Sequence, residues 1–128
     1  MRPTIVLSNS LSDHRELVSR LRKAGSFAEG EILDRLERGS CAFRVDLSGD
    51  VLAEFEEGEV AELTKDLGEF GSVLLEYGEV SCVRDLLREV IPGLSGFLDT
   101  NFGEVLAYEL VLERFERNPG WDWRASGR

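Results

Sequence analysis

The sequence predicts an α+β fold, a mixed sheet of about five strands with helices packed on it. Short apolar runs bounded by turn residues indicate strands, and amphipathic segments between these runs indicate helices. Residues 41–47 and 51–55 have the pattern of a central antiparallel hairpin. The expected order is β-α-α-β-β-α-β-α-β-α. The length of 128 residues suits one domain over residues 1–128, with a frayed tail at 124–128.

The first third of the chain predicts one strand and two helices. Residues 5–7 form an apolar run without alternation, which is typical of an interior strand. Asp13 followed by Glu16 has capping-box spacing, so the first helix is expected to begin there. Ser26 and Glu29 have the same spacing, and residues 26–36 predict a second, short amphipathic helix. Gly39 is expected to end this helix in a left-handed backbone conformation.

The hairpin is the clearest local signal. A three-residue loop at 48–50 places Val45 opposite Ala53, and Arg44 opposite Glu54 as an ion pair across the strands. A two-residue loop would mix apolar and charged side chains on one face. The longer loop is therefore expected, because strand register follows the pattern that buries one apolar face.

The second half of the chain alternates helices and strands. Apolar residues spaced by three and four predict a helix over 60–70, with one narrow apolar seam and acidic side chains elsewhere. Alternation predicts a strand at 72–77, and a helix is expected at 81–91, before a Pro-Gly pair. A short strand at 97–98 and a last helix at 103–117 complete the expected elements.

The charge is concentrated in the middle of the chain. Residues 45–113 hold 17 acidic and 3 basic residues, whereas both flanks are weakly positive and the whole chain carries −10. Lys65 is the only base among 11 acids in residues 46–79. Such a field repels nucleic acid and anionic membranes, and attracts a basic protein. The alternative is a solvated acidic face that only aids solubility.

The N-terminus and the cysteines suggest the compartment. Residues 5–7 are too short for the apolar region of a signal peptide, and no apolar run reaches the ~20 residues of a membrane span. A cytoplasmic location is therefore expected. Cys41 and Cys82 are far apart and form no CxxC pair, so they are expected to be reduced core residues.

Familiar catalytic patterns are missing. His14 is the only histidine and is expected to pack beside the first helix's apolar stripe. No GxSxG elbow or phosphate-binding glycine loop occurs. Residues 46–50 weakly resemble a calcium loop but lack the third ligand, the glycine at position 6 and the distal bidentate Glu. We therefore expect no catalytic residue, metal or cofactor. Asp99 and Asn101 flank Thr100 after a strand, where Asp99 or Thr100 is expected to cap the last helix.

The C-terminal part has more apolar residues than one core-facing stripe uses. Leu106 and Leu110 project from the side of the expected last helix. Trp121 and Trp123 are expected to fold back onto the domain as a hook, since two exposed indoles would be unusual. The alternative is that this flank and the tryptophans meet another chain.

These observations favour a small acidic domain that captures a basic protein, as immunity proteins capture bacterial toxins or nucleases. No nucleic acid or membrane is expected as partner, and the chain is expected to be a monomer or homodimer. One alternative is a self-associating module that uses Leu106, Leu110, Trp121 and Trp123. Another is a small ligand-binding domain or carboxylate hydrolase around Asp99 and Asn101. The candidate partner-binding residues are Glu54, Glu56, Glu57, Glu59, Glu62, Asp66 and Glu69.

Overall fold

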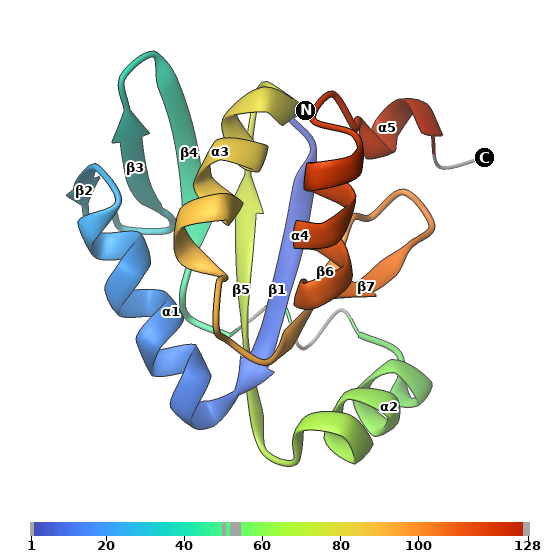
Figure 1. Ribbon diagram of the computed structural model, residues 1–128. Helices are drawn as coiled ribbons and strands as arrows, with labels where there is room; N and C mark the ends of the chain where they lie inside the picture. Colours follow the sequence, from blue (N-terminus) through green and yellow to red (C-terminus); the bar gives the residue numbers. More distant parts are fainter. Residues whose placement is uncertain (1, 50, 52–54, 127–128) are drawn as a thin grey trace.

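The computed structural model describes residues 2–49, 51 and 55–126, in which seven strands form one sheet (Figure 1). The strands are β1 (Thr4–Ser10), β2 (Ser26–Ala28), β3 (Asp34–Arg38), β4 (Cys41–Asp46), β5 (Phe70–Glu76), β6 (Gly96–Asp99) and β7 (Val105–Ala107). Their spatial order is β2-β3-β4-β5-β1-β6-β7, and each neighbouring pair is antiparallel. The predicted α+β class is confirmed. The mixed sheet of about five strands is wrong.

The helices are α1 (Leu11–Lys23), α2 (Glu57–Leu67), α3 (Val80–Val90), α4 (Tyr108–Arg117) and α5 (Trp123–Ser126). Helices α1, α3 and α4 lie over one face of the sheet (Figure 1). On that face Leu7 is opposite Val73 on one side and Leu98 on the other, and all three are fully buried. Because paired residues share a face and alternate along each strand, this face holds the main core.

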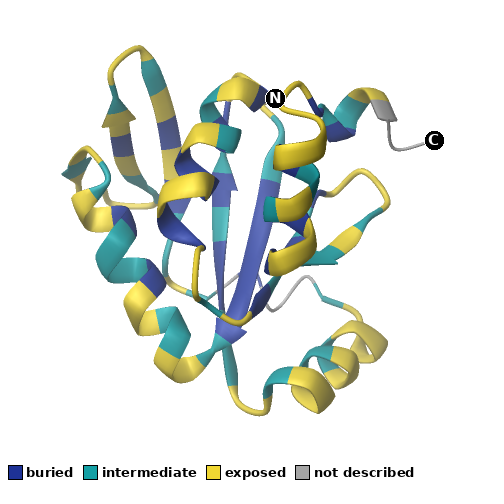
Figure 2. Cartoon of the chain, viewed as in Figure 1, coloured by how far each residue is buried: buried dark blue, intermediate teal, exposed yellow. Residues whose placement is uncertain are grey.

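The second face of the sheet is formed by the strand residues that alternate with those of the core face. Val6 and Ser8 on β1 point to it and are both buried. Helix α2 contributes little to any core, since none of its residues, all of which the structure describes, is buried (Figure 2). The predicted apolar seam exists, but Val60, Leu63 and Leu67 are only half-buried.

The helix expected at 26–36 is wrong. These residues form β2 and most of β3, with a loop between them. Leu36 is fully buried on β3, whereas Ile32 in the loop is 89% exposed. The local sequence suits a helix, but β3 pairs with β2 and β4, which satisfies the backbone hydrogen bonds of β3. Leu36 is thereby buried on the same face of the sheet as its partner Phe43.

The expected 41–47/51–55 hairpin is also wrong. β4 is present, but its neighbours are β3 and β5, with Arg44 opposite Arg35 on one side and Glu76 on the other. Because both edges of β4 are occupied there, no third strand can join it. Val51 and Phe55 lie outside strands, and Asp50 and residues 52–54, including the proposed partners Ala53 and Glu54, lie outside the described residues.

Three helices have other limits than expected. The helix expected over 60–70 is α2 at Glu57–Leu67, and Phe70 belongs to β5. α1 begins at Leu11, so Asp13 lies within the helix, and its Oδ2 accepts a hydrogen bond of 2.8 Å from the Ser95 backbone N–H. The last helix begins at Tyr108 rather than 103, because the preceding residues pair with β6 as the edge strand β7.

A disulfide joins Cys41, at the start of β4, to Cys82 on α3. The expectation of two reduced cysteines is therefore wrong. Disulfides persist mainly in oxidising compartments, so this bond weighs against the cytoplasmic location expected from the sequence. Among the residues described, no helix has the length and apolar character to cross a membrane.

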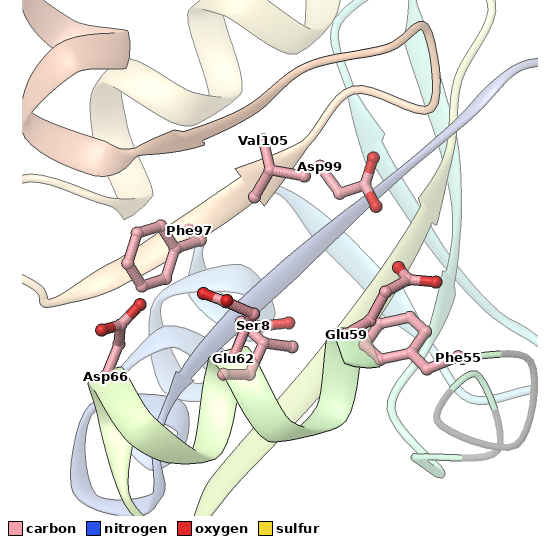
Figure 3. Close-up of a pocket in the computed structure, with 9 residues that line it drawn as sticks. Ser8, Phe55, Glu59, Glu62, Asp66, Phe97, Asp99 and Val105 are labelled. Atoms are coloured by element: carbon pink, nitrogen blue, oxygen red, sulfur yellow. The ribbon is translucent and has the colours of Figure 1, made fainter. Parts of the chain in front are cut away.

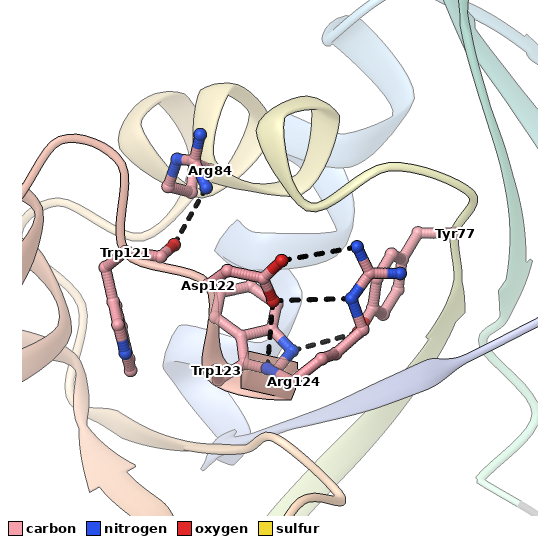
Figure 4. A network of polar contacts seen from close by, with 6 residues as sticks. All are labelled: Tyr77, Arg84, Trp121, Asp122, Trp123 and Arg124. Atoms are coloured by element: carbon pink, nitrogen blue, oxygen red, sulfur yellow. Dashed lines mark hydrogen bonds and ion pairs between the residues drawn. The ribbon is translucent and has the colours of Figure 1, made fainter. Parts of the chain in front are cut away.

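The C-terminal segment folds back on the domain, as predicted. Trp121 and Trp123 are buried, at 4% and 0% exposed. Figure 4 shows the contacts that hold them: Trp123 Nε1 donates to the Tyr77 hydroxyl at 2.9 Å, and Arg84 donates to the Trp121 carbonyl at 2.8 Å. The tail expected to fray is helical through Ser126, and residues 127–128 lie outside the described chain.

Candidate functional site

A pocket of about 360 Å³ lies between α2 and the second face of the sheet (Figure 3). It combines apolar side chains with carboxylates from both walls. Its lining residues are Ser8, Phe55, Glu59, Glu62, Leu63, Asp66, Phe97, Asp99 and Val105.

The strand wall of the pocket follows from the sheet register. Ser8 is paired with Phe97, and Asp99 with Val105, so these side chains share the face opposite the main core. Ser8 is buried and hydrogen-bonded to Ser72 through the two hydroxyl groups at 2.7 Å. Val105 is 58% exposed on the edge strand. The wall is thus closed beside Ser8 and open beside Val105.

The helical wall comes from one face of α2. The lining residues on this helix are spaced by three, one and three positions, so they lie on one side of α2 over adjacent turns. They are Glu59, Glu62, Leu63 and Asp66. The Glu59 carboxylate also accepts a hydrogen bond of 3.2 Å from the Glu56 backbone N–H at the start of the helix. Figure 3 shows the Glu59 and Asp66 carboxylates pointing from α2 toward the strands.

Asp99 is a half-buried acid on the strand wall of the pocket. Burial raises the pKa of its carboxyl group above the ordinary value, and the carboxylate of Glu59 across the pocket raises it further. The Asn101 backbone N–H opposes this shift by donating to Asp99 Oδ1 at 2.8 Å. A desolvated acid in a pocket is a feature that binding and catalytic sites share.

Only Asp99 of the predicted Asp99/Asn101 site lines the pocket. The Asn101 amide donates to the Thr4 hydroxyl at 3.0 Å and to its carbonyl at 3.1 Å, and Asn101 does not line the pocket. The expected caps are wrong as well. Asp99 and Thr100 accept from the Asn101 and Phe102 N–H groups in the β6–β7 turn, far from the start of α4.

The predicted partner-binding acids lie on and beside α2. Glu59, Glu62 and Asp66 line the pocket, Glu56, Glu57 and Glu69 are exposed outside it, and Glu54 lies outside the described residues. We call Glu56, Glu57, Glu59, Glu62, Asp66 and Glu69 the acidic α2 surface.

Within the described part of the chain, no member of the acidic α2 surface forms an ion pair. Other acids of the middle segment do find partners, such as Glu89 with Arg38 at 2.6 Å and Glu104 with Arg114 at 3.1 Å. Helix α2 and its flanks therefore carry six exposed acids without an ion-pair partner in the described residues.

Other chemistry is sparse around this pocket. Over the residues that the structure describes, no three histidine, cysteine or acidic side chains are arranged to hold a metal ion. Both cysteines are in the disulfide, so neither offers a thiol to His14. His14 packs against Gly71, and burial lowers the pKa of its imidazole.

The residues of the self-association alternative are in different environments. Trp121 and Trp123 are buried within the chain and offer no surface to a second copy. Leu106 is half-buried and packs against the core, whereas Leu110 is 49% exposed. Of this set, only Leu110 presents a largely exposed apolar side chain.

Sequence reasoning missed Ser8, Phe97, Val105 and Phe55 as lining residues of the pocket. Ser8, Phe97 and Val105 come together only through strand pairing, and Phe55 belongs to a segment that was expected to be a strand. Strand alternation could have placed Ser8 opposite the core face. It could not have shown that α2 lies beside that face.

No protein-family model matches the chain, and comparisons with curated proteins and with solved structures found no significant match.

Proposed function

We propose that this protein is a binding domain that captures a basic protein partner through the acidic α2 surface. One observation carries the proposal: six acids on and beside α2 are exposed, and none has an ion-pair partner among the described residues. Like charges held close together repel each other, and a cationic partner would relieve that repulsion.

The position of α2 supports the same use. A helix with no buried residue adds little to the hydrophobic core, so its acidic sequence is not explained by packing. Complementary charge raises association rates and selects partners, whereas affinity comes from a few well-packed anchors. The acidic α2 surface would supply the complementary charge, and the partly apolar pocket beside it would hold an anchor.

An inhibitor of the immunity type is the specific form of this proposal. A toxin or nuclease domain with a cationic active-site cleft would present the required charge, and the acidic α2 surface would cover that cleft. Nucleic acid and anionic lipid carry the wrong sign of charge to bind here.

Charge reversal tests the proposal. Proteins captured from cell extract by the wild type are identified, and their association rates are measured at several salt concentrations. Replacing Glu57, Glu59 and Glu62 by Lys should slow association by at least roughly tenfold and flatten its salt dependence, because steering by opposite charge is lost.

The matched control reverses three exposed acids away from α2, Glu31, Glu109 and Glu116, which changes the net charge by the same amount. It should retain most of the wild-type rate. Equal slowing of both variants, or none in either, would contradict use of the acidic α2 surface.

A small-ligand-binding domain is the second candidate. The observation in its favour is that the pocket encloses the half-buried Asp99, whose carboxyl pKa is raised mainly by burial. A small cationic or neutral ligand that binds tightly without any protein partner would support it over protein capture.

A further inference from the structure

We propose that the pocket between α2 and the sheet receives an arginine side chain of the basic protein partner. This inference rests on the proposed function and specifies it: the acidic α2 surface would attract the partner, and the pocket would hold its central anchor.

The pocket has apolar walls suited to a long aliphatic stem. Phe55, Leu63, Phe97 and Val105 line it from the helix side, the strands and the segment before α2. Its volume of about 360 Å³ is at the lower end of the ~300–1,000 Å³ typical of small-ligand pockets. A space of this size fits one extended side chain rather than a folded segment.

The same pocket is lined with acids on both walls. Glu59, Glu62 and Asp66 project from α2, and Asp99 stands on β6 (Figure 3). Carboxylates on two walls offer acceptors to the several N–H donors of a broad organic cation. A positive head group would also reverse the unfavourable effect of Glu59 on ionised Asp99.

Arginine fits this combination better than lysine. Its planar guanidinium group carries five N–H donors, which can reach carboxylates on opposite walls at once. It also stacks on aromatic rings, and the pocket supplies Phe55 and Phe97. An ammonium group is a compact charge that is more strongly hydrated, so it gains less from such walls.

Titration with small probes tests the pocket directly. N-acetyl-arginine methylamide, its lysine counterpart and its uncharged citrulline counterpart are added separately while backbone amide resonances are followed by NMR. The arginine probe should cause saturable shifts centred on Ser8, Leu63, Phe97 and Asp99, with a Kd of roughly millimolar order. The lysine probe should bind more weakly, and the citrulline probe should not bind.

Two neutralised variants on the same helix separate pocket binding from general attraction. Asp66 lines the pocket and Glu57 does not, yet Asp66→Asn and Glu57→Gln each remove one charge from α2. Asp66→Asn should weaken arginine binding by roughly tenfold or more, since it removes a charge-assisted hydrogen bond. Glu57→Gln should change it by less than about twofold. Asp99→Asn should behave like Asp66→Asn.

The outcomes distinguish this inference from the proposed function. Three outcomes would overturn the arginine pocket, even where charge reversal still slows partner association. They are resonance shifts that spread over α2 without saturating, equal effects of Asp66→Asn and Glu57→Gln, and binding of the citrulline probe as well as the arginine probe. Localised arginine binding together with no effect of charge reversal on partner association would instead overturn the protein-binding function.

Discussion

Asp99 on β6 and Glu59 on α2 are acids on opposite walls of one pocket, and neither has a basic partner among the residues that the structure describes. Burial raises the pKa of Asp99, and the nearby carboxylate of Glu59 adds to the effect. Keeping an ionised acid in such a place costs folding stability, which is a common feature of binding sites.

Asp99→Asn should therefore stabilise the fold at pH 7 while it weakens arginine binding. The pKa of Asp99 is raised above its unfolded value of 3.8, so Asp99 favours the folded state below that pH and loses this contribution as pH rises through the folded pKa. The amide oxygen can still accept from the Asn101 N–H. Urea unfolding should show a gain of up to about 1 kcal/mol at pH 7 that disappears near pH 3. A loss of stability at pH 7 would contradict this account.

Acidification should destabilise the protein through His14. Burial lowers the pKa of its imidazole below 6.5, so the unfolded chain binds a proton more readily than the folded one. This contribution is fully present above pH 6.5 and is lost as pH falls toward the folded pKa. The free energy of unfolding should decline between pH 7 and 5, and His14→Gln should reduce that slope. Parallel curves for the two proteins would assign the decline to other groups.

Reduction of the Cys41–Cys82 disulfide should lower stability substantially. The two cysteines are separated by 41 positions, and closing a loop of that size in the unfolded chain is worth about 4 kcal/mol in the chain-entropy model. Urea unfolding with and without reductant measures the effect, with the Cys41→Ser/Cys82→Ser variant as control. That variant should not respond to reductant.

The Trp123–Tyr77 hydrogen bond should contribute to anchoring the C-terminal hook. Both side chains are fully buried, so removing one partner leaves a polar group unsatisfied. Trp123→Phe and Tyr77→Phe should each cost about 1–3 kcal/mol of unfolding free energy. The double variant should cost less than the two combined, because the bond can be lost only once. Additive costs would show that the bond contributes nothing beyond packing.

The strongly periodic segments were predictable from the sequence. The helix expected at 81–91 is α3 at Val80–Val90, and the strand expected at 72–77 is β5 at Phe70–Glu76. The buried residues of α3 recur at spacings of three and four, and Val73 and Leu75 on β5 alternate with less buried neighbours, so the period of the pattern indicates the element type.

Weakly apolar segments were not predictable in this way. Gly39 does adopt the expected positive φ of 56°, but it lies in the β3–β4 turn rather than at the end of a helix. A single glycine sets the local backbone conformation. The segments on either side of Gly39 become strands or helices according to whether distant segments can pair with them.

Composition and local pattern determined the α+β class, the unneutralised acidic segment and the buried tryptophan hook. Only the tertiary structure decided that Cys41 meets Cys82, and that Ser8, Phe97 and Asp99 share a pocket with one face of α2. The physical reason is that hydrophobic periodicity and charge are properties of neighbouring residues. Strand partners and pocket walls instead depend on which segments, far apart in the chain, satisfy each other's backbone and apolar surface at the same time.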